Sequence, residues 1–88
     1  FNRKSSIEQV AIISLRMDDQ KGLLGMVLNV ISNFHGNIVT LNQDVPIKQV
    51  AYVTISININ ELSISISELV KIINAIEGVK LVELLAIE

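Results

Sequence analysis

The sequence predicts an α+β protein with a ferredoxin-like βαββαβ sandwich, a four-stranded antiparallel sheet with two helices on one face. Segments with an apolar residue at every second position are interspersed with two segments in which apolar residues recur at helical spacing. Their order is strand, helix, strand, strand, helix, strand, which right-handed crossovers convert into this arrangement. The 88 residues are enough for one two-layer core.

The first half of the chain contains one strand and one helix. Residues 9–17, QVAIISLRM, alternate and are rich in β-branched side chains, which predicts a strand. A turn follows, in which Asp18 or Asp19 is expected to cap the next helix. That helix is indicated by apolar residues at helical spacing, which are Leu24, Val27, Leu28, Ile31 and Phe34. Gly36 is expected to form its left-handed C-terminal cap.

The rest of the chain is expected to form two strands, a second helix and a last strand. Residues 37–45 alternate up to a turn at Pro46, and residues 49–60 show the cleanest alternation in the chain. Ser65 and Glu68 have the spacing of a capping box, so a helix is expected to begin there and to end at Gly78. Residues 79–88 predict a last strand, whose core-facing residues are expected to be Val82, Leu84 and Ala86.

Half of the residues are hydrophobic, although only three are aromatic. In a chain this short such an apolar content favours association with another chain. With both helices on one face of the sheet, the opposite face is expected to hold some of these side chains, namely Val10, Ile12, Val39, Leu41 and Tyr52. A homodimer or higher homo-oligomer is therefore expected.

Several functional classes are disfavoured by composition. The net charge is -2 without a basic cluster, so nucleic-acid binding is not expected. No cysteine is present and His35 is the only histidine, so neither a metal site nor another cofactor is expected, and no set of catalytic residues is evident. No apolar run approaches the roughly 18 residues of a membrane span, and a cytoplasmic location is the default expectation. Residues 1–8 are expected to be a linker or the remnant of a missing N-terminal segment.

Gly22 and Gly25 lie at the expected start of the first helix. They form neither a dinucleotide-binding fingerprint nor a P-loop, because the third glycine and the GK[ST] ending are missing. A glycine at this place leaves backbone N–H groups open to a small anion such as a carboxylate, or it simply allows a tight turn. Gly25 is expected to permit close approach of a neighbouring segment.

The segment DQKGLLGMVLNVISNFHGNIVTLNQ resembles the ACT domain, a small-molecule-binding regulatory module. Its hallmark is an Asp-Arg-Pro-Gly-Leu-Leu turn, which is matched here by Asp19, Gly22, Leu23 and Leu24, with Gln20 and Lys21 in place of Arg-Pro. The family's Gly-x-Asn-Ile is represented by Gly36, Asn37 and Ile38, one residue shorter. The resemblance covers residues 9–88, and within the family it is most similar to small bacterial ACT proteins of the PheB type.

The resemblance implies a dimer that binds an amino acid between protomers and acts in the control of amino-acid metabolism. Asp19 would bind the ligand's amino group, the backbone of Gly22 and Leu23 would bind its carboxylate, and Gln20 belongs to the same turn. Asn37 and Ile38, contributed by the other protomer, would close the site. The PheB name suggests an aromatic amino acid.

Two alternatives remain open. One is a structural dimerisation module with an empty site. The other is part of a chorismate mutase, an activity that some PheB-type proteins carry as a label. Catalysis of that reaction is commonly aided by cationic groups around a dianionic substrate, and this chain has only Arg3 and Arg16 with a few lysines. The segment is therefore expected not to be an enzyme.

Overall fold

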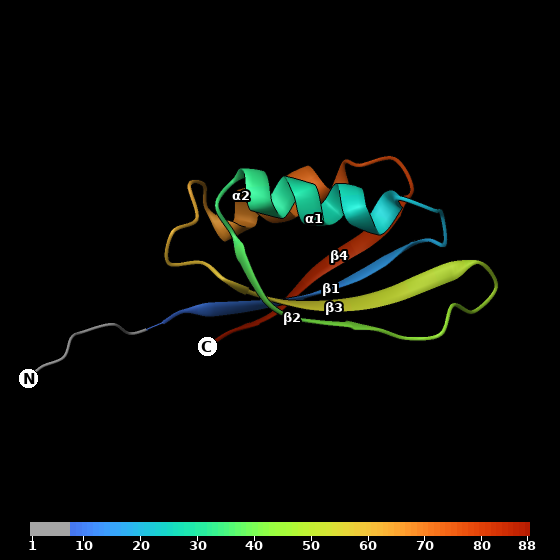
Figure 1. Cartoon of the computed structure of the whole chain (residues 1–88), viewed down its shortest axis with the longest axis horizontal. Coiled ribbons are helices and arrows are strands. Elements are labelled where there is room, and N and C mark those ends of the chain that lie inside the picture. Colours follow the sequence, from blue (N-terminus) through green and yellow to red (C-terminus); the bar gives the residue numbers. More distant parts are fainter. Residues whose placement is uncertain (1–7) are drawn as a thin grey trace, which may run out of the picture.

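The computed structural model describes residues 8–88 and has the predicted α+β fold. The elements are β1 (Val10–Asp18), α1 (Leu23–Asn33), β2 (Asn37–Gln43), β3 (Val50–Asn58), α2 (Ile66–Asn74) and β4 (Val79–Ile87). The strands form one antiparallel sheet in the order β2-β3-β1-β4, and both helices cover the same face of it (Figure 1). Of the expected linker, residues 1–7 lie outside the described residues.

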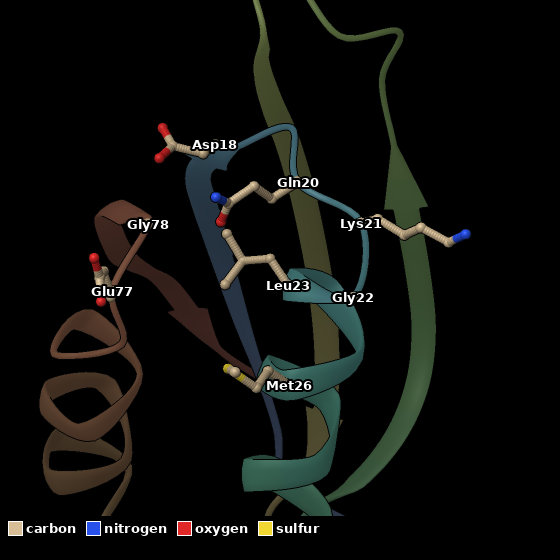
Figure 2. Close-up of a pocket in the computed structure, with 8 residues that line it drawn as sticks. All are labelled: Asp18, Gln20, Lys21, Gly22, Leu23, Met26, Glu77 and Gly78. Atoms are coloured by element: carbon tan, nitrogen blue, oxygen red, sulfur yellow. The ribbon is translucent and has the colours of Figure 1, made fainter.

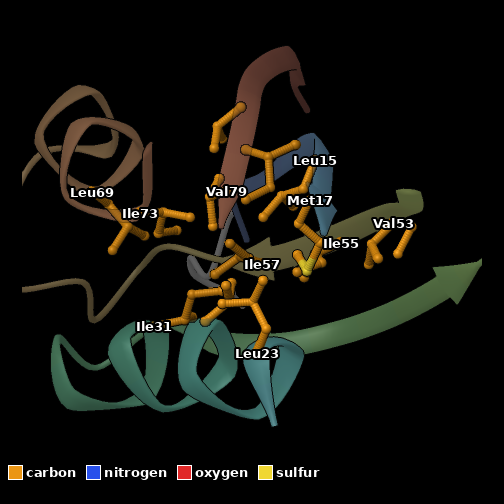
Figure 3. Close-up of a cluster of buried hydrophobic side chains, with 14 residues drawn as sticks. Leu15, Met17, Leu23, Ile31, Val53, Ile55, Ile57, Leu69, Ile73 and Val79 are labelled. Atoms are coloured by element: carbon orange, nitrogen blue, oxygen red, sulfur yellow. The ribbon is translucent and has the colours of Figure 1, made fainter. Parts of the chain in front are cut away.

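The core lies between the two central strands and the helices. In β1 and β3 alternate residues are fully buried, and the register places Ile13 opposite Ile55. The helices contribute their apolar stripes, including Ile31 of α1 and Ile73 of α2 (Figure 3). No polar or charged side chain is buried among the described residues. The period-two and period-3.6 patterns in the sequence therefore correspond to the two sides of one core.

The edge strand β2 departs from strict alternation. Ile38 pairs with Ile57 and Thr40 pairs with Ser56. Val39 therefore has no partner in β3 and is the extra residue of a β-bulge. Beyond the bulge, Leu41 pairs with Ile55, whose side chain belongs to the core. The prediction that Leu41 lies on the open face is therefore wrong, because one inserted residue exchanges the two faces of the strand.

The edge strand β4 has two irregularities of the same kind. Its register with β1 shifts by one residue at Lys80 and again at Leu85. Val82 is buried as predicted, and Leu84 pairs with the buried Ile13, so it also lies on the predicted side of the sheet although it is 41% exposed at the edge. Ala86 pairs with Ile12 of the open face, so the expectation for Ala86 is wrong. The bulge at Leu85 breaks the alternation on which that expectation rested.

The two helices do not end at the glycines that the sequence indicates. His35, with φ 67°, adopts the left-handed conformation after α1, so the prediction of a left-handed Gly36 is wrong. Gly36 is needed for space instead, because a Cβ there would lie 2.7 Å from Ile31 Cγ2. The second helix begins at the predicted capping box of Ser65 and Glu68 but ends at Asn74, four residues before Gly78.

Candidate ligand-binding site

The turn between β1 and α1 ends in a helix start that lacks a side-chain cap. Gly22 occupies the N-cap position with φ 86°, and neither aspartate caps the helix, contrary to expectation. The Leu23 N–H donates to the Gln20 carbonyl at 3.2 Å, and the Met26 N–H donates to the Gly22 carbonyl at 3.0 Å. Within the described residues the N–H groups of Leu24 and Gly25 have no acceptor. The first turn of α1 therefore retains free donors at the positive end of the helix dipole.

A hollow of about 530 Å³ lies beside this helix start (Figure 2). It is lined by residues of the β1–α1 turn, the first turn of α1 and the α2–β4 turn: Asp18, Gln20, Lys21, Gly22, Leu23, Met26, Glu77 and Gly78. One chain thus supplies two walls of the hollow, from segments about fifty residues apart in sequence. A hollow of this volume is large enough for a small metabolite.

The α2–β4 turn is held closely against the β1–α1 turn. The Asp18 N–H donates to the Gly78 carbonyl at 2.8 Å. A Cβ on Gly78 would lie 2.9 Å from Leu23 Cδ2 and 3.3 Å from Gln20 Oε1, and its φ of +98° disfavours any other residue. Gly78 therefore fixes the distance between the two walls of the hollow.

The hollow combines groups of opposite charge with an apolar wall. Asp18 and Glu77 supply carboxylates, and Lys21 also lines the hollow, although its ammonium group points away from the other labelled side chains (Figure 2). The positive counterpart in the hollow is therefore the start of α1. Asp18 Oδ1 is 3.6 Å from Lys80 Nζ, but both side chains are well exposed, so this ion pair is weak. Met26 is 56% exposed, which is unusual for its type and leaves an apolar surface beside the charges. Such a site can bind a small molecule that carries both charges.

Asp19 lines a different hollow on the other side of the same turn. This second space, about 640 Å³, lies between the turn and the tip of the β2–β3 hairpin, where Lys48 and Gln49 are located. The Asp19 N–H donates to the Gln49 carbonyl at 2.8 Å. The hairpin tip therefore holds the β1–α1 turn from one side, and the α2–β4 turn holds it from the other.

The structure brings together only part of the residue set suggested by the sequence. Gln20, Gly22 and Leu23 line the first hollow, and Asp19 lies just beyond it. Asn37 and Ile38 follow the opposite end of α1, whose 11 residues span about 16 Å, so one chain does not bring them to the turn. Gly25 does not serve close approach as expected, because nothing lies within 4 Å of the position of its Cβ.

Sequence reasoning missed several lining residues, namely Asp18, Lys21, Met26, Glu77 and Gly78. The sequence indicates Gly78 only as a helix stop, and its neighbour Glu77 belongs to no motif. No local signal distinguishes a turn here, because the end of α2 at Asn74, four residues before Gly78, is seen only in the structure. Only the tertiary structure shows which other turn it meets.

Two further observations concern the side chains and helices of the described part of the chain. Within residues 8–88 no three potential metal-ligating side chains of histidine, cysteine, aspartate or glutamate cluster together. The described helices are all too short or too polar to cross a bilayer.

The fold is that of an ACT domain. The ACT domain of the GTP pyrophosphokinase of Chlorobium tepidum superimposes with a TM-score of 0.69 at 23% identity, covering 90% of this chain and all of that one. The regulatory subunit of aspartate kinase from Thermus thermophilus matches with a TM-score of 0.63 at 14% identity, over 89% of this chain and 52% of that one.

The sequence is also similar to a UPF0735 ACT domain-containing protein of Caldicellulosiruptor saccharolyticus. The two are 38% identical over 85 residues, which is 97% of this chain and 57% of the relative. The chain therefore spans a little more than half the length of the curated relatives it matches. No protein-family model matches it.

Proposed function

We propose that residues 9–88 form a regulatory ACT domain that binds an amino acid, dimerises and acts in the control of amino-acid metabolism in the cytoplasm, with residues 1–8 as its linker. One observation carries the proposal. The first hollow lies at a helix start where the N–H groups of Leu24 and Gly25 lack acceptors, within a chain whose fold is that of an ACT domain.

The chemistry of this hollow matches an amino acid. Its carboxylate would accept hydrogen bonds from the free N–H groups of the first turn of α1, where the helix dipole favours negative charge. Its ammonium group would be bound by a carboxylate of the preceding turn, either Asp18 inside the hollow or Asp19 beyond it. Leu23 and Met26 would contact the ligand's side chain, and this apolar wall is consistent with an aromatic ligand.

A second protomer would complete the site. Asn37 and Ile38 are too far from the turn in their own chain to contact the same ligand, so they would contribute from the partner. Val39 and Leu41, which follow them in β2, are 53% and 40% exposed. Burying apolar side chains of this kind contributes about 25 cal/mol per Å². The edge of β2 is therefore the surface through which we propose that the dimer forms.

Titration calorimetry with each of the common amino acids tests ligand binding. We expect saturable heat for one or a few of them at millimolar concentration or below. Asp18→Asn and Asp19→Asn should weaken binding by roughly tenfold for whichever carboxylate binds the ammonium group. Glu61→Gln removes one carboxylate from a residue that does not line this hollow, and it should leave binding unchanged. Absence of heat with every amino acid would contradict the proposal.

Dimerisation is tested separately by sedimentation equilibrium. The average molar mass of the wild-type chain should rise from the monomer value to the dimer value as its concentration increases. Leu41→Lys should shift this equilibrium toward the monomer. If the chain dimerises normally while Asp19→Ala and Asn37→Ala change neither its function nor any ligand response, it is a structural module without a ligand.

We also propose kinship with PheB-type proteins, and a chorismate mutase activity is the alternative function that this kinship raises. Among residues 8–88, Lys21 is the only cationic residue that lines the first hollow, whereas that reaction has a dianionic substrate. We therefore propose a regulatory role without catalysis for this segment. Measurable consumption of chorismate by the purified chain would overturn this part of the proposal.

A further inference from the structure

The open face of the sheet has a hollow of its own, away from the helices and from the α1 start. It measures about 230 Å³ and is lined by residues of three neighbouring strands and of the segment after β2: Ser14, Leu15, Arg16, Asp44, Tyr52, Val53, Thr54, Leu81 and Glu83. Neither the ACT-domain resemblance nor the proposed amino-acid site uses these residues. Their origin in adjacent strands makes this hollow a part of the rigid sheet.

Strand register explains why the sheet is hollowed here. Arg16 of the central strand β1 pairs with Tyr52 on one side and with Leu81 on the other. Two residues earlier, Ser14 pairs with Thr54 and with Glu83. A row of long side chains thus stands beside two short hydroxyl side chains on the same face. The hydroxyl groups form the floor, and the longer side chains form the walls.

Arg16 supplies the anion-binding group of this hollow. Its guanidinium carbon lies 5.8 Å from the centroid of the Tyr52 ring, a cation–π distance that orients the side chain. Within residues 8–88 Arg16 makes no ion pair, although two carboxylates line the same hollow. A guanidinium group offers a planar fork of donors that matches a carboxylate. The hydroxyls of Ser14 and Thr54 can add further donors.

The acidic walls select among anions. Asp44 and Glu83 also line the hollow, and neither forms an ion pair within the described part of the chain. Two carboxylates close to the guanidinium group would repel a dianion, yet each can accept hydrogen bonds from an ammonium group. A ligand with one carboxylate and one protonated amine satisfies both kinds of group at once.

We propose that the open-face hollow binds a small zwitterion, with its carboxylate on Arg16 and its ammonium group on Glu83 or Asp44. The volume admits only a compact molecule, with Leu81 as its apolar contact. This site is independent of the one proposed at the start of α1, because the two share no lining residue.

Amide chemical shifts of the isotope-labelled chain provide the test, with glycine and alanine as probes. We expect saturable shifts at Ser14, Arg16 and Thr54 with either probe, and much weaker ones with acetate, methylamine or inorganic phosphate. Arg16→Gln should weaken binding by roughly tenfold through loss of the charge-assisted hydrogen bonds. Lys71→Gln removes a cation on α2, away from this hollow, and should bind as wild type.

The same spectra distinguish the two proposed sites. Shifts of the Leu24 and Gly25 amides report on the start of α1, so they succeed or fail separately from the open face. Shifts confined to the start of α1, or unaltered open-face binding in Arg16→Gln, would overturn the open-face proposal. It would also be overturned if the open-face resonances moved with protein concentration alone, because a second copy would then cover the hollow.

Discussion

At the scale of single residues, the glycines show that one residue type serves unrelated physical purposes. Gly22 adopts a positive φ at the helix start, whereas Gly36 has an ordinary φ but no room for a side chain. Gly25 has neither constraint, because open space surrounds the position of its Cβ. Substitution by alanine should therefore separate them.

We expect Gly36→Ala to lower the free energy of unfolding by about 1–3 kcal/mol. The new methyl group would lie 2.7 Å from Ile31 Cγ2 and 3.1 Å from Ile57 Cγ2, and both of these side chains are fully buried. Gly25→Ala is the matched control, and it should raise stability by about 0.5 kcal/mol through helix propensity. Urea denaturation measures both, and equal effects of the two substitutions would contradict this account.

At the scale of elements, the β2–β3 hairpin contains a strained turn. Lys48 and Gln49 have φ values of 52° and 67°, between Ile47 and Val50, which exchange two backbone hydrogen bonds of 3.0 Å. Two successive left-handed residues define the turn type that Asn-Gly forms most readily. Neither lysine nor glutamine favours that conformation, so this turn costs stability.

Replacing both turn residues, Lys48→Asn with Gln49→Gly, should raise the free energy of unfolding by about 1–2 kcal/mol. The substitution relieves backbone strain and retains the Gln49 carbonyl position, which accepts a hydrogen bond from the Asp19 N–H. Thermal unfolding provides the measurement. Introducing glycine at an ordinary strand position, as in Thr54→Gly, should lower the stability of the protein. If Thr54→Gly instead raised it, the turn conformation would not be the cause of the effect at Gln49.

The capping box of α2 makes a second prediction at this scale. The Glu68 N–H donates to Ser65 Oγ at 3.1 Å, and the Ser65 N–H donates to Glu68 Oε1 at 3.3 Å. Ser65→Ala removes the first acceptor and should cost about 1 kcal/mol. Glu68→Gln keeps an oxygen acceptor and should cost less. Chemical denaturation of the two variants decides the order, and a larger loss for Glu68→Gln would contradict it.

At the scale of the whole molecule, stability depends on one core between the sheet and two short helices. Ile55, at the centre of β3, is fully buried, so Ile55→Ala should cost about 2–5 kcal/mol through lost burial and a cavity. Ile47 is 60% exposed, and Ile47→Ala should cost less than about 0.5 kcal/mol. Small domains are stable by only about 5–15 kcal/mol, so the first variant should unfold well below the wild-type temperature. If Ile55→Ala and Ile47→Ala had comparable melting temperatures, the stability of the protein would not depend on this core as described.

The whole molecule also distributes its apolar surplus unevenly. Of the large hydrophobic side chains that remain exposed, most belong to the two edge strands and the β2–β3 hairpin, such as Leu85 and Val45. The centre of the open face is polar by comparison, with Ser14 and Thr54 at its middle. Association is therefore expected at the edges of the sheet, whereas the open face has the character of a small-molecule site.

The sequence by itself determined the class of fold and its core, because alternation and helical spacing are local properties that each segment carries without its neighbours. The same is true of the turn at Gly22 and the capping box at Ser65. The tertiary structure decided what depends on pairing between distant segments. A bulge exists only relative to a partner strand, so the faces of Leu41 and Ala86 were not readable from their own strands. The walls of both proposed sites likewise come from segments far apart in the chain, and only packing brings Glu77 to Gly22, or Glu83 to Arg16.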